Sequence, residues 1–144
     1  MSDCIFCRIV AGEIPAVKVY EDDQLVAFRD IKPKAEVHLL LIPKQHISSL
    51  MELNRDQDTL MAHMIAVLPE LALAEGLEQG FRTIINTGKG AGQEVFHVHL
   101  HVIPRHAGDG FGFRFGPNYT NRPPREQLES VAAQIRAALG RDAV

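Results

Sequence analysis

Residues 97–103 alternate strictly between histidine and apolar side chains, in the order His97-Val98-His99-Leu100-His101-Val102-Ile103. Successive side chains of a β-strand point to opposite faces, so this segment predicts a strand with three imidazoles on one face. The apolar residues then lie on the other face and belong to the core. The chain must therefore build a sheet that packs one side of this strand and solvates or pairs the other.

Three adjacent imidazoles are costly to desolvate unless each has a partner. A lone histidine, such as His63 or His106, is most often an ordinary satisfied polar residue. Three histidines in alternation instead predict that the imidazoles face a polar cleft, a metal or an anion. One use of such an array is a catalytic metal held by three ring nitrogens with a bound water. Another is nucleophilic attack by a histidine on phosphorus, with a neighbouring histidine protonating the leaving group.

A glycine-rich loop stands directly before this strand, with the sequence Gly88-Lys89-Gly90-Ala91-Gly92-Gln93. Glycines let backbone N–H groups approach phosphate oxygens closely. The glycine loop and the histidines together favour a phosphate-binding site. The spacing of the histidines alone does not exclude a catalytic metal.

Length and composition limit the number of domains and the kinds of partner that the chain can have. The chain has 144 residues, with 15 basic and 18 acidic side chains and a net charge of −3, which predicts a single domain and no polymeric nucleic-acid partner. No apolar run reaches the roughly 18 residues of a membrane span, and the start Met1-Ser2-Asp3-Cys4 lacks signal-peptide character. We expect a cytoplasmic protein that does not bind membranes.

The remaining patterns predict an α+β fold with a mainly antiparallel sheet of about five strands, one long central helix and a C-terminal helix. Strands are expected at 17–21, 25–30, 38–43, 81–86 and 95–104, the first two forming a hairpin. The central helix is expected over 56–75, with Asn54 as cap, Gly76 as stop and Pro69 as a kink or break. An amphipathic helix containing Leu128, Val131, Ala132, Ile135 and Leu139 follows Pro123-Pro124.

The pattern at 97–103 resembles that of the histidine triad, or HIT, family. The resemblance is reinforced by Cys4-Ile5-Phe6-Cys7, Glu13-Ile14-Pro15, Asp30-Ile31, the segment from His38 to His46, Asn86 and Gly92-Gln93. The chain is similar to the Hint-like branch, nucleoside phosphoramidases and related nucleotide hydrolases, in its zinc-containing bacterial form. The resemblance implies one HIT domain over residues 1–144, with a core of about 4–106 and a C-terminal extension of 107–144.

The resemblance implies that His99 attacks the α-phosphorus of a purine nucleoside phosphoramidate or related conjugate, such as one of AMP. A covalent nucleotidyl-histidine would form and then be hydrolysed. A neutral imidazole is a nucleophile at one nitrogen when an acceptor holds the other N–H, and we expect a carbonyl of the same strand to do so. His101 would contact the phosphate and protonate the leaving group, and His38 would complete the network.

By the same resemblance, Asp30 would accept hydrogen bonds from the ribose hydroxyls. Phosphate oxygens would be held by Asn86, by Gln93 and by the backbone of Gly92 and Val95. Glu94 departs from the family pattern, which often has a small hydroxyl residue there, and its charge would favour a cationic or neutral leaving group. The base pocket would be lined by Phe6, Ile9, Ile14, Phe28, Ile31 and Leu40, each of which is equally compatible with a plain core role.

Cys4 and Cys7 alone indicate metal ligands, redox partners or buried apolar residues. The resemblance supplies His46 and His97 as two further ligands. A Cys₂His₂ set would be closed and tetrahedral, so the zinc would be structural and not catalytic.

Two other functions remain open. One is a dinucleoside polyphosphate hydrolase, which shares the triad and Gln93, and the other is a catalytically idle nucleotide-binding or interaction module. The resemblance also implies a homodimer. Phe111, Phe113 and Phe115 alternate within Gly108–Gly116, which predicts an edge strand, a loop over the core, or a segment that meets a second subunit.

Overall fold

The computed structural model describes residues 3–33 and 38–141. Its contacts divide the chain into two compact units, Met1–Asp109 and Gly110–Val144. The first unit contains every candidate site residue. The expected extent of the domain remains a prediction.

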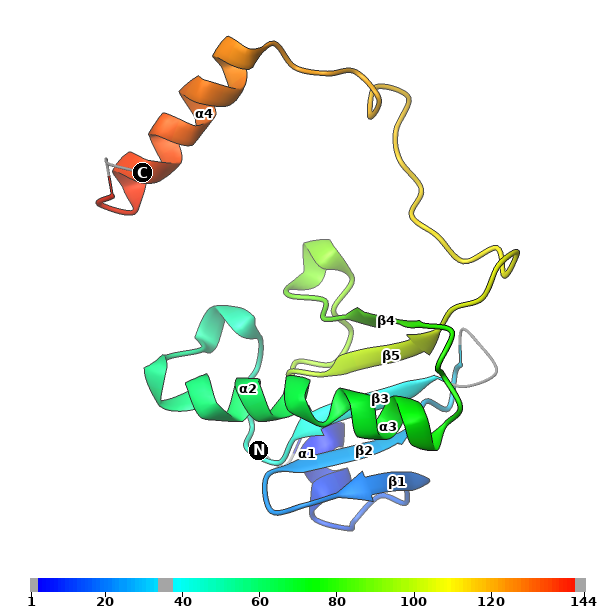
Figure 1. The fold of residues 1–144 in the computed structure, drawn as a ribbon. Coiled ribbons are helices and arrows are strands. Elements are labelled where there is room, and N and C mark those ends of the chain that lie inside the picture. Colours follow the sequence, from blue (N-terminus) through cyan, green and yellow to red (C-terminus); the bar gives the residue numbers. More distant parts are fainter. Residues whose placement is uncertain (1–2, 34–37, 142–144) are drawn as a thin grey trace. The chain divides into compact units, whose positions relative to one another are not determined.

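The first unit is built on a five-stranded antiparallel sheet in the order β1-β2-β3-β5-β4 (Figure 1). The α+β class with this sheet is confirmed. A hairpin joins the first two strands, and β5 lies between β3 and β4. The strands are β1 (Lys18–Glu21), β2 (Leu25–Arg29), β3 (Leu39–Pro43), β4 (Phe81–Ile84) and β5 (Leu100–Pro104).

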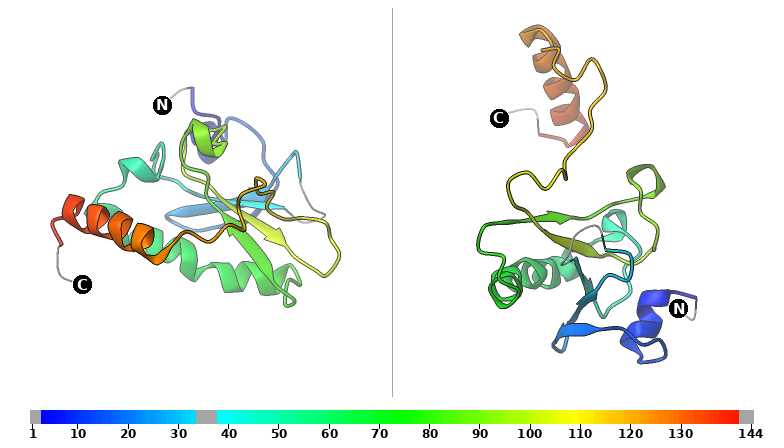
Figure 2. Two further views of the ribbon diagram at one scale, coloured as in Figure 1. Left: turned by 90° about the horizontal axis from the view of Figure 1, so that it is seen from above. Right: turned by 90° about the vertical axis from the view of Figure 1, so that its right-hand side faces the viewer.

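Helices cover both faces of this sheet. In Figures 1 and 2, α2 (Asp58–Ala66) and α3 (Leu68–Ala74) lie on one face, and α1 (Ile5–Val10) lies on the other. Burial on both faces explains why β3 is apolar at all five positions. The face of β3 towards α1 carries Leu40 and Ile42, whereas Leu39 and Leu41 belong to the larger core beneath α2 and α3.

The predicted central helix is divided into α2 and α3 at Val67. The break expected from Pro69 is thus confirmed, because a proline ring fits the first turn of a helix but not its interior. Asn54 forms a capping box with Gln57 at the short 3₁₀ helix η2 (Arg55–Gln57), which leads into α2. Gly76, with φ of 71°, follows the end of α3 as predicted. A further 3₁₀ helix, η1, spans Leu50–Glu52.

The predicted strand at 95–104 is too long at its start, because β5 begins only at Leu100. The His97 N–H donates locally to the Val95 carbonyl, and the Val98 N–H donates to Ile47 outside the sheet. These hydrogen bonds take the chain out of the ladder. The alternation itself is confirmed, since Val98, Leu100 and Val102 all enter the core beneath α2 and α3.

The second unit contains the helix α4 (Arg125–Ala138) after an irregular segment. The three phenylalanines expected in an edge strand or loop lie in that irregular segment, and the ring of Phe115 stacks on Tyr119 at 3.7 Å. α4 carries Leu128, Val131 and Ile135 as exposed apolar side chains. In the described parts of both units, no helix has the length and apolarity needed to cross a membrane.

Candidate active site and metal cluster

Four histidines form a buried row beside the centre of the sheet. His101 lies on β5 opposite Leu40 of β3, and His38 directly precedes β3. His97 and His99 lie in the irregular segment that leads into β5. Each of the four side chains is at most 9% exposed.

His99 is oriented by the backbone of its own segment. Its Nδ1–H donates to the carbonyl oxygen of His97 at 2.6 Å. A carbonyl only accepts, so Nδ1 carries a proton and Nε2 of the neutral ring keeps its lone pair. The structure thus has the expected backbone acceptor for His99, in the segment just before β5, and Nε2 is left without a proton.

His101 stands on one side of this ring and links it to His38. The ring centroids of His99 and His101 are 5.1 Å apart. His38 Nε2 and His101 Nδ1 share a hydrogen bond of 2.8 Å. His38 Nδ1 lies 3.6 Å from a carboxylate oxygen of Asp30, which is too far for a good hydrogen bond.

The carboxylate of Asp30 is held at the end of β2. Its other oxygen accepts the Lys32 N–H at 2.8 Å, and the Asp30 N–H donates to the His38 carbonyl at 2.8 Å. Ligand atoms of Asp30, His38 and His101 lie within 4.8 Å of one another. Across residues 3–33 and 38–141, no such group of potential ligands contains His99. This geometry does not support one metal held by all three strand histidines.

An apolar cluster adjoins His99 on the α1 face of the sheet. Phe6 makes edge-on contacts with His97, His99 and Phe28, at centroid distances of 5.9, 5.2 and 5.6 Å. Ile31 lies outside the cluster and is 90% exposed. The other residues expected in a base pocket belong to the cluster: Phe6, Ile9, Phe28 and Leu40 are buried, and Ile14 is partly buried against them.

The glycine loop is closed by the buried side chain of Gln93. Its amide NH₂ donates to the carbonyls of Ser48 and Val95, at 2.7 and 3.0 Å. Its amide oxygen accepts the Gly88 N–H at 2.8 Å. Sequence reasoning missed this bracing role, because residue type and spacing do not show which backbone groups the Gln93 amide contacts.

The predicted phosphate donors are therefore partly engaged. Both Gln93 amide protons are donated to backbone carbonyls, and the Gly92 N–H donates to the Lys89 carbonyl at the 3₁₀ helix η3 (Lys89–Ala91). Phosphate binding by these two groups would require those hydrogen bonds to open. Asn86 and Val95 are half-buried. Glu94 lines an open hollow of about 410 Å³ together with Asp3, Cys4, Ile5, His46, Val95 and Phe96.

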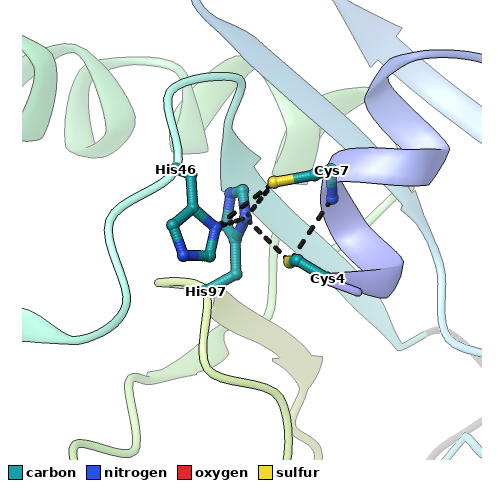
Figure 3. Close-up of side chains that lie close together, drawn as sticks. All are labelled: Cys4, Cys7, His46 and His97. Carbon is teal, nitrogen blue, oxygen red and sulfur yellow. Dashed lines mark hydrogen bonds between the residues drawn. The ribbon is translucent and has the colours of Figure 1, made fainter. Parts of the chain in front are cut away.

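Cys4, Cys7, His46 and His97 converge next to His99, as Figure 3 shows. The His97 Nδ1 atom lies 3.5 Å from the Cys4 sulfur and 3.6 Å from the Cys7 sulfur. His46 Nδ1 lies 3.2 Å from the Cys7 sulfur and 3.2 Å from His97 Nδ1. All four potential ligand atoms lie within 4.8 Å of one another.

These separations fit a tetrahedral zinc ion. Zinc–ligand bonds of ordinary length imply about 3.6 Å between sulfur and nitrogen and about 3.3 Å between two nitrogens. His97 is also held in the required tautomer, because its Nε2–H donates to the Pro43 carbonyl at 2.7 Å and leaves Nδ1 for a ligand. The donor set and its spacing are compatible with zinc.

Burial affects two of these four groups. Burial lowers the pKa of His97, although its hydrogen bond to Pro43 opposes this, and so favours the neutral form that binds metals. Burial and then the neighbouring Cys4 raise the pKa of the Cys7 thiol. A divalent cation between the two sulfurs would offset their mutual repulsion.

The two remaining histidines lie outside both groups. The His63 Nε2 and a carboxylate oxygen of Asp22 lie 2.6 Å apart, which confirms the expectation of a satisfied polar residue. His106 is exposed on the segment after β5. The contact of Phe6 with His99 was not foreseen, because the resemblance gave Phe6 only as a base-pocket or core residue.

Comparison with known proteins agrees with this arrangement. The HIT domain family model matches residues 11–108. Protein HitA of Neisseria gonorrhoeae is 54% identical over 103 residues, which are 72% of this chain and 96% of HitA.

Two solved structures extend the likeness. A HIT family hydrolase from Legionella pneumophila Philadelphia 1 has 45% identity and a TM-score of 0.70, with 80% of this chain and 99% of that chain covered. A histidine triad nucleotide-binding protein from Candida albicans has 30% identity and a TM-score of 0.83, with 96% of this chain and 98% of that chain covered. Their names describe a hydrolase and a nucleotide-binding protein.

Proposed function

Because the chain belongs to the HIT domain family, we propose that it is a hydrolase or transferase acting on purine nucleoside phosphoramidates or related nucleotide conjugates. It cleaves the bond between the α-phosphate and the leaving group and releases a nucleoside monophosphate. The observation that supports this most directly is the hydrogen bond from His99 Nδ1–H to the His97 carbonyl. It leaves Nε2 of a buried, neutral imidazole as the nucleophile.

In the first step, His99 Nε2 forms a bond to the α-phosphorus while the bond from phosphorus to the leaving amine breaks. The amine departs with a proton supplied by His101, which is hydrogen-bonded to His38. In the second step, water attacks the phosphorus and gives a proton back to His101, the histidine–phosphorus bond breaks and the monophosphate leaves. General acid assistance by His101 contributes roughly 10²–10⁴ in rate.

The nucleotide would be held by groups around this row. Asp30 has carboxylate oxygens that accept hydrogen bonds from both ribose hydroxyls. The apolar cluster around Phe28 takes the purine base. The α-phosphate lies near the glycine loop, with Asn86, Gln93 and the backbone of Gly92 and Val95 as its donors after the loop rearranges.

Glu94 lines the open hollow beside the loop. A carboxylate there repels an anionic leaving group and favours a cationic or neutral amine.

The cysteine and histidine cluster would hold one zinc ion through Cys4, Cys7, His46 and His97. Four protein ligands leave no open position, so the ion supplies structural cross-linking and not Lewis-acid catalysis. The cluster ties α1 to the segment that carries His99.

We further propose a cytoplasmic homodimer, with the aromatic segment Gly108–Gly116 at or near the interface. Phe113 and Phe115 are 67% and 55% exposed in the single chain, and exposed aromatic side chains are common at the centres of protein interfaces. Sedimentation at micromolar concentration measures the subunit number, and a monomer there would contradict the dimer.

The decisive experiment compares the turnover of two substrates and measures the mass of the protein by mass spectrometry after the reaction is quenched early. Wild type should turn over adenosine phosphoramidate faster than a diadenosine polyphosphate, and its mass should increase by one nucleotidyl group early in the reaction. A large preference for the dinucleotide would replace phosphoramidase with dinucleoside polyphosphate hydrolase. The absence of an adduct, together with unchanged activity in His99→Ala, would contradict the assignment of His99 as the nucleophile.

A second arm tests catalytic metal chemistry. A chelator that stops turnover of folded protein, together with metal that persists in a Cys4→Ser, Cys7→Ser double variant, would indicate a catalytic ion outside the cluster. We expect the double variant to lose the metal.

A further inference from the structure

Phe6 connects the metal cluster to His99. It lies on the six-residue helix α1, between Cys4, whose sulfur accepts the Cys7 N–H at the start of the helix, and Cys7 itself. The phenyl ring is 6% exposed and contacts His99 at a centroid distance of 5.2 Å and an interplanar angle of 80°. The helix turn that carries both sulfurs therefore also places a ring against the proposed nucleophile.

His99 is consequently enclosed by two rings. Phe6 contacts it from α1, and His101 contacts it from β5 at 5.1 Å with an interplanar angle of 65°. The torsion that rotates an imidazole about its Cβ–Cγ bond has broad wells. A single hydrogen bond to the His97 carbonyl and these ring contacts thus set which nitrogen faces the site.

The two groups that hold His99, the His97 carbonyl and the Phe6 ring, are both connected to the proposed metal ligands. His97 provides the carbonyl that accepts the His99 Nδ1–H, and its own Nδ1 belongs to the cluster. Phe6 is carried by α1, which also carries Cys7 and is capped by Cys4. A helix of six residues has little intrinsic stability, so cross-linking by a bound ion is a strong constraint on it.

We propose that Phe6 is a positioning residue for His99 and that metal binding at Cys4, Cys7, His46 and His97 sets its position. This inference rests on the proposed function, because it takes His99 as the nucleophile. Metal binding then controls the orientation of the His99 imidazole in addition to stabilising the fold. Loss of the ion releases α1, withdraws the Phe6 ring and lets the His99 imidazole rotate.

A purely structural Phe6 would give a different result. The ring also packs on Phe28 at 5.6 Å, so its loss weakens the core whatever its effect on His99. Phe6→Leu keeps an apolar side chain and all four ligands while it removes the aromatic edge. Phe81→Leu is the matched control, because Phe81 is partly buried against the core beneath α2 and α3 and lies outside the site.

The primary readout is the tautomer of His99, measured by ¹⁵N NMR of the side chain at one fixed pH without substrate. Zinc-loaded wild type and Phe81→Leu should show one Nδ1–H form. Phe6→Leu, and wild type depleted of zinc by a chelator, should show a mixture of both tautomers. Re-addition of zinc should restore the single form in wild type and leave Phe6→Leu unchanged.

The second readout is the rate of adduct formation in a single turnover at saturating adenosine phosphoramidate, which is insensitive to affinity. We expect about a tenfold decrease for Phe6→Leu relative to Phe81→Leu, equivalent to about 1.4 kcal/mol in the barrier. A tautomer and a rate in Phe6→Leu that match those of Phe81→Leu would overturn the inference. Failure of the proposed function is separate, because it shows as full activity in His99→Ala while the tautomer is measured without turnover.

Discussion

The carbonyl oxygen of His97 accepts the Nδ1–H of His99 at 2.6 Å. The imidazole of the same His97 donates its Nε2–H to Pro43 and directs Nδ1 at the two cysteine sulfurs. One residue thus serves the proposed nucleophile through its backbone and the proposed metal site through its side chain. Changes in the cluster should therefore be detectable at His99.

The cluster should bind one zinc ion per chain, measured by elemental analysis of purified protein. Cys4→Ser and Cys7→Ser should each reduce the bound zinc and the thermal midpoint, because a structural metal contributes its binding free energy to folding. His106→Ala, which changes an exposed histidine, should do neither. Full zinc content in both serine variants would contradict the ligand assignment.

Asp22 should stabilise the protein at neutral pH and lose this effect in acid. Burial opposes ionisation of its carboxyl, but hydrogen bonds from Tyr20, from the Gln24 and Leu25 N–H groups and from His63 together hold its pKa well below the ordinary value of 3.8. A depressed carboxyl pKa stabilises the fold above the unfolded-state value, and the stabilisation declines as the pH falls through and below it.

Asp22→Asn should accordingly lower the free energy of unfolding by about 2 kcal/mol at pH 7, the scale of charged hydrogen bonds. The difference from wild type should shrink as the pH falls below about 4. Asp23→Asn, which changes an exposed neighbouring carboxylate, should have little effect. Chemical denaturation at several pH values measures both, and a pH-independent loss in Asp22→Asn would contradict the assignment.

Periodicity predicted the sheet, the division of the central helix and the core face of the histidine strand, because these depend on local side-chain alternation and on proline geometry. It failed at the beginning of β5, where a tertiary hydrogen bond from Val98 to Ile47 competes with the ladder. Short-range patterns carry no information about such partners. The same limit explains why the Pro43 carbonyl behind His97 was not foreseen.

The candidate site was predicted largely through family motifs, and the structure brings Cys4, Cys7, His46 and His97 together as expected. It adds roles that the motifs do not describe. Phe6 contacts His99, and Gln93 braces the glycine loop with its amide. Both are buried contacts between segments distant in sequence, which residue type and spacing alone do not determine.

Gln93 should be necessary for the shape of the glycine loop. Gln93→Ala removes the side-chain partner of the Ser48 carbonyl and of the Gly88 N–H, and it leaves the Val95 carbonyl with only the His97 N–H. These losses should cost about 1–3 kcal/mol in the free energy of unfolding. Gln93→Glu should be at least as harmful, because an ionised carboxylate does not donate and repels both carbonyls. Denaturant titration compares the variants, and unchanged stability in both would exclude the bracing role.

His101 should matter in proportion to how much the leaving group needs a proton. His101→Ala should slow cleavage of an adenosine phosphoramidate that carries an alkylamine by about 10²–10⁴, the usual contribution of a general acid. A nucleotide ester of p-nitrophenol leaves without protonation, so the same variant should lose far less activity on it. His63→Ala, remote from the row and paired with Asp22, should keep wild-type rates on both substrates. Equal losses on the two substrates in His101→Ala would show that His101 binds or positions the phosphate and does not protonate the leaving group.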